Sequence, residues 1–127
     1  MKIAAMIARY LVGLVFFVFG LNGFLHFIPM TGLPPGLAGQ FLNVLIESHY
    51  VLFVSALQVA GGALLLVNRY VPLGLTLLGP VIVNIILFHL LMEHTGLAMA
   101  IVVAILWGLV VFRQRQHFSG LFVQRTS

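Results

Sequence analysis

Four apolar stretches without Asp, Glu, Lys or Arg occupy residues 10–28, 51–67, 71–92 and 97–112 of this chain. A helix rises about 1.5 Å per residue, so each stretch comes close to the roughly 30 Å hydrocarbon core of a bilayer. Mean hydropathy is +1.20. Only 6% of the residues are charged, against about a quarter in soluble domains. The chain is therefore predicted to be a single integral membrane domain over residues 1–127, with four transmembrane helices.

The basic residues predict how these helices are oriented. Lys2 and Arg9 precede the first stretch, Arg69 lies between the second and third, and a basic tail occupies residues 113–127. Cytoplasmic loops are enriched in Lys and Arg, so both termini and Arg9 are expected on the cytoplasmic side. Short turns make successive spans antiparallel, which predicts an all-α, up-down-up-down four-helix bundle. The basic residues behind the net charge of +4 lie at the ends of the apolar stretches, so they indicate membrane topology and not a nucleic-acid partner.

The segment between the first two spans is too short to cross the membrane. Several prolines and glycines predict a loop, after which residues 36–48 can form a helix. Small or polar residues recur along it in steps of three and four: Gly36, Gln40, Asn43 and Glu47. This amphipathic pattern predicts either a helix at the membrane interface or a partly buried lid over the mouth of the bundle.

The third stretch carries a proline and an asparagine that an ordinary membrane helix does not need. Pro80 cannot donate to the carbonyl of Thr76, so a kink is expected there. Asn84 places an amide at membrane depth, where unpaired polar groups are costly and usually face the bundle interior. We therefore expect the other helices to pack around this polar face.

Two other stretches carry small residues at the spacing of helix contacts. In the second, Ser55, Gln58 and Gly62 share one face. The fourth repeats a small residue at every fourth position: Ala100, Ala104 and Gly108. Both patterns predict close backbone approach between helices.

With this topology, the polar side chains gather in the outer half of the bundle. Four of the five histidines and both carboxylates, Glu47 and Glu93, fall on the outer side, whereas the inner half is nearly all apolar. The candidate ligand-binding residues are Asn22, His26, Gln58, Asn84 and His89. Their one-sided clustering is the main functional signal in the sequence.

Two interpretations of this cluster follow from its side chains. In the first, Asn22, Gln58 and Asn84 form interhelical hydrogen bonds of about 0.6 kcal/mol each and bind nothing. In the second, an outward-facing pocket holds a quinone, with its head group on His26, Gln58 and Asn84. The quinone tail would then pack among phenylalanines of the first and third spans: Phe16, Phe19, Phe24 and Phe88.

A haem or metal site is the least favoured interpretation. Each helix offers a single histidine within the membrane, and no HxxxH, HExxH or CxxC spacing occurs. The chain has no Cys and only two carboxylates, so thiol chemistry and a self-contained carboxylate-pair hydrolase are not expected. No catalytic residue is predicted.

Two long segments carry a family resemblance. The runs ARYLVGLVFFVFGLNGF (residues 8–24) and ALQVAGGALLLVNRYVPLGLTLLGPVIVNIILFH (residues 56–89), with the short final span, resemble the DoxX family of small bacterial membrane proteins. The most specific elements are Arg9 followed by Gly20-Leu21-Asn22-Gly23, and Gln58 followed by Gly61-Gly62. The resemblance covers nearly the whole chain and implies a four-span protein of the bacterial cytoplasmic (inner) membrane.

The DoxX family takes its name from a subunit of a thiosulfate:quinone oxidoreductase, and most members have no assigned activity. The resemblance implies an accessory subunit of quinone-linked redox chemistry, working with a redox partner protein or as a homo-oligomer. Catalysis would then be at most that of a subunit of a quinone-linked oxidoreductase. The alternative class is a structural or interaction subunit without a ligand.

Overall fold

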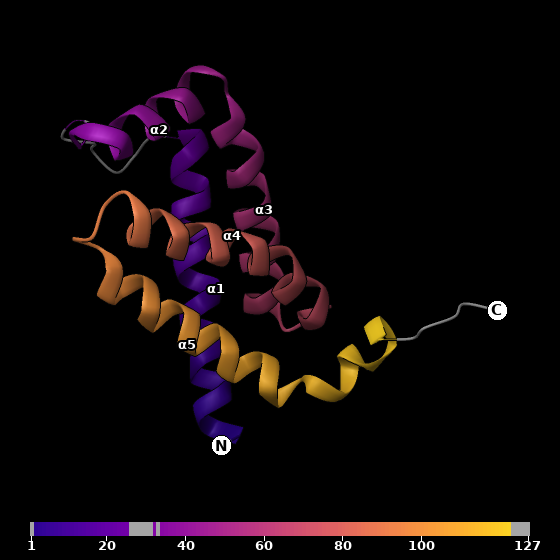
Figure 1. Cartoon of the computed structure of the whole chain (residues 1–127). Helices are drawn as coiled ribbons and strands as arrows, with labels where there is room; N and C mark the ends of the chain where they lie inside the picture. The colour runs from indigo at the N-terminus through magenta and orange to yellow at the C-terminus, as the bar shows by residue number, and fades with distance from the viewer. Residues whose placement is uncertain (1, 26–31, 33, 123–127) are drawn as a thin grey trace.

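The computed structural model describes residues 2–25, 32 and 34–122, and its regular elements there are all helices (Figure 1). In chain order they are α1 Lys2–Leu25, α2 Gly36–Glu47, α3 Tyr50–Val67, α4 Val71–Leu91, α5 Leu97–Arg113 and the 3-10 helix η1 Arg115–Phe122. Helices α1, α3 and α4 are long and apolar enough to cross a membrane. A fourth span is present if α5 and residues Arg115–Leu121 of η1, bent by 82° relative to each other, count as one. The prediction of an all-helical chain with several helices long and apolar enough to span a membrane is thus confirmed for the described residues.

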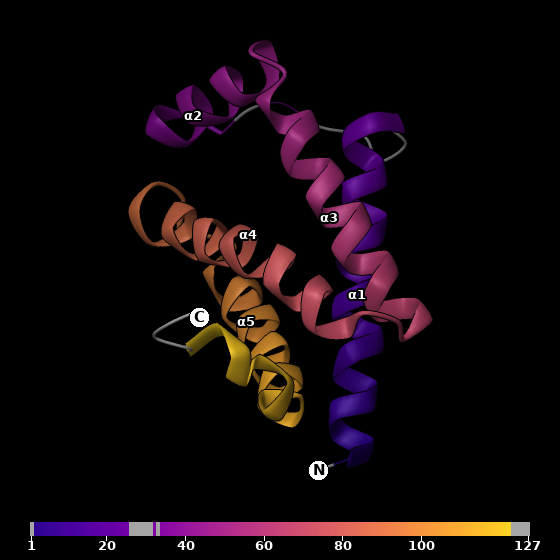
Figure 2. The ribbon, with the colours of Figure 1, turned by 90° about the vertical axis from the view of Figure 1, so that its right-hand side faces the viewer.

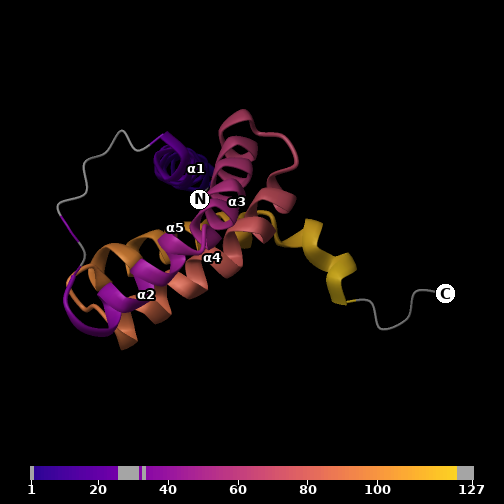
Figure 3. The same ribbon diagram turned by 90° about the horizontal axis from the view of Figure 1, so that it is seen from above.

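The four long helices form a ring of contacts. Helix α1 packs against α3 and α5, and α4 packs against the same two helices. Figure 1 and Figure 2 show α1 and α3 side by side, with α4 and α5 crossing them obliquely. The view in Figure 3, which looks down α1, shows the same oblique course of α4 and α5. The up-down arrangement across a membrane stays a prediction.

Helices α3 and α4 meet at a tight turn and then diverge. Asn68 and Tyr70, on either side of Arg69, have positive φ values of 57° and 52°. Asparagine is one of the few residues that adopts this left-handed conformation readily. Pro72 follows in the first turn of α4, where no backbone N–H is required. Away from this turn the two helices form a wedge, and α2 lies across its open end (Figure 2).

Three glycines of α1 lie against the small face of α3 that the spacing predicts. An added Cβ would approach α3 atoms to within 3.0 Å at each position: Gly13 against Gly62, Gly20 against Gln58, and Gly23 against Ser55. The residue numbers of these pairs rise along α1 and fall along α3, so the two helices are antiparallel. The predicted contact face of the second span is therefore confirmed.

Two adjacent glycines bring α3 against two helices at once. A Cβ on Gly62 would lie 2.6 Å from the backbone nitrogen of Phe17 in α1. A Cβ on Gly61 would lie 2.6 Å from Cγ of Leu78 and 3.1 Å from the carbonyl oxygen of Gly74, both in α4. Both 2.6 Å separations are shorter than real Cβ contacts, so a side chain at either position would displace Leu78 or move α3 away from its neighbours.

Helix α5 packs differently from the prediction. Ala100 is buried, but a Cβ on Gly108 would have nothing within 4 Å, so the expected close approach at Gly108 is wrong. The indole of Trp107 lies beside Gly79 of α4, and its Nε1 donates a 3.0 Å hydrogen bond to the carbonyl oxygen of Leu75. A large ring at this contact keeps the two backbones apart.

Alanine substitution of two helical glycines tests this packing. Ala normally stabilises a helix interior by about 1 kcal/mol relative to Gly. At Gly62 the new methyl group meets the backbone of Phe17, which cannot rotate away, so we expect Gly62→Ala to lower the free energy of unfolding by about 1–3 kcal/mol. Gly108→Ala, which adds the same methyl group in open space, should leave stability unchanged or raise it. Equal stability of the two variants in detergent unfolding experiments would contradict the close approach.

Candidate functional site

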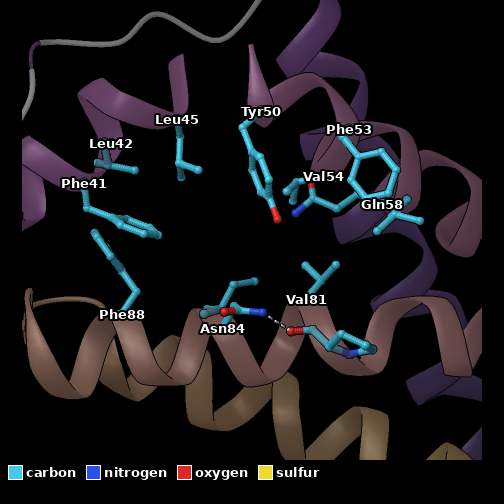
Figure 4. Close-up of a pocket in the computed structure, with 13 residues that line it drawn as sticks. Phe41, Leu42, Leu45, Tyr50, Phe53, Val54, Gln58, Val81, Asn84 and Phe88 are labelled. Atoms are coloured by element: carbon cyan, nitrogen blue, oxygen red, sulfur yellow. Dashed lines mark hydrogen bonds between the residues drawn. The ribbon is translucent and has the colours of Figure 1, made fainter. Parts of the chain in front are cut away.

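A cavity of about 370 Å³ lies in the wedge between α3 and α4, beneath α2 (Figure 4). Most of its lining is apolar, and all three helices contribute to it. Four aromatic rings line it: Phe41 of α2, Tyr50 and Phe53 of α3, and Phe88 of α4. The rings of Phe41 and Phe88 lie 5.8 Å apart between centroids, so they join α2 to α4. Helix α2 therefore forms one side of the cavity, and both interpretations of residues 36–48 stay predictions.

Three polar side chains reach this apolar space. In Figure 4 the hydroxyl of Tyr50 and the amide of Gln58 extend from α3 into the cavity, and Asn84 faces them from α4. Gln58 is half-buried, whereas Asn84 and Tyr50 are exposed. The cavity thus presents neutral hydrogen-bonding groups on two opposite walls.

Asn84 is held in place by its own helix. Its Nδ2 donates a 2.8 Å hydrogen bond to the carbonyl oxygen of Pro80, one turn earlier. The amide nitrogen carries two donors, so one N–H remains for another acceptor. Thr76 makes the same type of bond, 2.8 Å from its hydroxyl to the carbonyl oxygen of Pro72.

The expectation that Asn84 faces the bundle interior is wrong. The buried face of α4 is apolar and consists of Val71, Gly74, Leu75, Leu78, Val81 and Ile82. Asn84 and Pro80 lie on the exposed side, toward the cavity. The local bond to Pro80 gives one amide N–H of Asn84 a partner within its own helix, so this donor does not require a neighbouring helix. Helix α4 continues through Pro80, and the expected kink stays a prediction.

The other candidate residues lie elsewhere. Asn22 and His89 do not line the cavity, and His26 lies outside the described residues. Nδ1 of His89 is 2.8 Å from the carbonyl oxygen of Ile85, and its ring lies against Gly96 in the turn before α5. Of the five predicted side chains, the cavity therefore brings together Gln58 and Asn84.

The phenylalanines predicted to hold a ligand tail are also divided. Phe88 lines the cavity, whereas Phe16 is 2% exposed within the helical core. Phe19 and Phe24 lie on the exposed surface of α1. The aromatic lining is completed instead by Tyr50 and Phe53 of α3 and by Phe41, whose position depends on the placement of α2.

Two hydrogen bonds between helices come from residues outside the predicted polar cluster. Nη1 of Arg9 in α1 donates to the carbonyl oxygen of Leu65 in α3, and Trp107 donates to Leu75. Arg9 is 8% exposed, so its side chain is buried among the helices, a feature that the charge pattern did not predict. A signal was present: Arg9 shares the three- and four-residue spacing of the buried residues Ala5 and Val12.

Neither a metal site nor a similarity to known proteins adds to the evidence from the cavity. Within residues 2–25, 32 and 34–122, no three His, Cys, Asp or Glu side chains lie close enough together to hold a metal ion. In comparisons with known proteins, no family model, curated protein or solved structure matches this chain. The resemblance to the DoxX family therefore stays a prediction. The geometry of the cavity is the structural evidence for a function.

Thiol labelling can test the accessibility of this cavity, since the chain has no native cysteine. We expect Asn84→Cys to react with a small maleimide in mild detergent, and Leu45→Trp, which places an indole in the cavity, to slow that reaction. Val83→Cys is the control, because Val83 is 56% exposed but does not line the cavity. Labelling of Val83→Cys should not respond to Leu45→Trp. Equal slowing at both positions would contradict the presence of the cavity.

Proposed function

We propose that this chain is an integral membrane protein that binds a quinone-type molecule between α2, α3 and α4. The observation that carries the proposal is the apolar cavity of about 370 Å³ with Gln58 and Asn84 on opposite walls. Small-molecule sites are typically clefts of about 300–1,000 Å³ with mainly apolar linings and a few placed polar groups. The cavity falls within that description.

The chemistry of the lining favours a planar molecule with carbonyl acceptors. The amide N–H groups of Gln58 and Asn84 and the hydroxyl of Tyr50 are neutral donors, and a quinone ring presents an acceptor oxygen at each end. Aromatic side chains favour offset or edge contacts with a planar ring. Phe41 and Phe88 at one end, and the exposed Phe53 at the other, supply such contacts. The site has no charged residue, which suits a neutral ligand.

The proposal extends to topology and cellular role. Four spans, formed by α1, α3, α4 and α5, would run up and down through the bacterial cytoplasmic membrane with both termini in the cytoplasm. The placement of Lys2, Arg69 and Arg113 at chain ends and at one turn supports this orientation. Helix α2 would then lie at the outer interface and close the cavity.

In this role the protein would be a DoxX-like accessory subunit that passes a quinone to or from a redox partner protein. The resemblance of residues 8–24 and 56–89 to that family supports the assignment. The absence of a charged or thiol side chain in the cavity is consistent with binding and transfer, and the electron-transfer step would belong to the partner.

Substitution of the two amides tests this function. Gln58→Leu and Asn84→Leu each remove one hydrogen bond worth about 0.5–1.5 kcal/mol while filling a similar volume. We therefore expect each to weaken binding of a short-chain benzoquinone by about 2- to 10-fold. Equilibrium dialysis of the purified protein in mild detergent measures the dissociation constants.

Thr76→Val provides the matched control for Asn84→Leu. Thr76 lies on the same helix and makes the same bond to a proline carbonyl, but it does not line the cavity. Its substitution should leave quinone binding unchanged. If all three variants bind the quinone as the unmodified protein does, the cavity is not a quinone site, and the alternative of a structural or interaction subunit is favoured.

A further inference from the structure

Arg9 is a buried cation without a carboxylate beside it. It is 8% exposed, its guanidinium lies 4.3 Å from the ring centroid of Tyr10, and Nη1 donates to the carbonyl oxygen of Leu65. These are a neutral ring and a neutral acceptor, and a guanidinium carries five donors. The contacts orient Arg9 but leave its charge uncompensated, and burying an unpaired charge is costly.

No acidic side chain lies in this region. It contains only two acidic side chains, Glu47 and Glu93. Glu47 is exposed at the end of α2, and Glu93 accepts hydrogen bonds from Thr95 in its own turn. Neither lines the space around Arg9. Neither acidic side chain of this chain therefore compensates the charge of Arg9, which favours an anion supplied from outside the chain.

Arg9 lines a pocket that is built to receive an anion. The pocket has a volume of about 230 Å³ and lies between the start of α1, the turn after α3 and the end of α5. Three cationic side chains from these places line it: Lys2, Arg9 and Arg113. The amides of Asn68 and Gln114 also line it. Ala5, Met6 and Val110 form an apolar side. Arg fits phosphate oxygens with paired donors, and Lys adds a compact positive charge.

We propose that this pocket binds the phosphate group of an anionic membrane lipid. The apolar surface of α1 that adjoins the pocket supports a lipid as the source of the phosphate, because Ile3, Met6 and Ile7 are 69%, 47% and 51% exposed and can contact acyl chains. Basic pockets between transmembrane helices on the cytoplasmic side are typical sites for anionic head groups.

A bound head group would also stabilise the packing of the helices. Arg9 belongs to α1 and bonds to α3, and Arg113 is the last residue of α5. A phosphate between these two cations would join α1 and α5 at a point where like charges otherwise repel each other. Anionic lipid is thus expected to raise thermal stability as well as to bind.

The test uses the whole protein in detergent micelles that contain phosphatidylglycerol or, separately, phosphatidylcholine. Native mass spectrometry measures the lipid retained per protein. We expect selective retention of phosphatidylglycerol, which Lys2→Gln and Arg113→Gln each lower about fivefold, as expected for about 1 kcal/mol per cation. Both residues are exposed, so these variants should fold, whereas Arg9→Gln also removes the bond to α3.

Arg115→Gln is the charge-matched control, because Arg115 lies near Arg113 in the chain but does not line the pocket. It should retain phosphatidylglycerol as the unmodified protein does. Equal loss in Arg115→Gln and Arg113→Gln, or equal retention of the two lipids, would overturn the site. A further arm adds inorganic phosphate: if it stabilises the protein as much as phosphatidylglycerol at the same concentration, a lipid source is contradicted.

Discussion

The contact of α3 with both α1 and α4 at Gly62 and Gly61 determines where the remaining elements lie. Without side chains at these two positions, α3 lies against the backbone of α1 on one side and against α4 on the other. Helix α4 leaves this contact at an oblique angle, so the two helices diverge from their shared turn (Figure 2). The cavity is the space inside this wedge, and α2 covers it. A shift of α3 by the width of one methyl group would alter the cavity without touching any residue that lines it.

The two ends of the molecule offer different chemistry. The cavity beneath α2 combines neutral amides with aromatic rings and has no charged lining residue. The pocket at the start of α1 has three cations and no carboxylate. A neutral ligand with carbonyl acceptors suits the first, and a phosphate group suits the second. Because the bond from Arg9 to Leu65 ties α1 to α3, the proposed occupation of the basic pocket would also stabilise the helix contact on which the cavity depends.

Much of the helical framework could be predicted from the sequence, because uncharged apolar stretches and a three-residue turn leave few alternatives to helices. The contact face of Ser55, Gln58 and Gly62 followed from spacing alone. The four-residue spacing of small residues could not reveal that the indole of Trp107 separates α5 from α4 near Gly108. A residue period says which positions share a face, but it does not give the size of the side chains beside them. Charge counting placed Arg9 on the cytoplasmic side, whereas its burial could have been predicted from its spacing to Ala5 and Val12. For the site, the pairing of Gln58 with Asn84 was predictable, but the contribution of α2 required the three-dimensional arrangement.

Photo-crosslinking measures most directly whether the cavity binds a quinone. An azido-substituted benzoquinone would be bound to the purified protein in mild detergent, illuminated, and located by peptide mass spectrometry. We predict adducts concentrated in residues 41–58 and 80–88, the two segments that contain the lining residues of the cavity. These adducts should be lost when unlabelled quinone competes. Adducts spread over the exposed faces of α1 and α5, or insensitivity to the competitor, would contradict it.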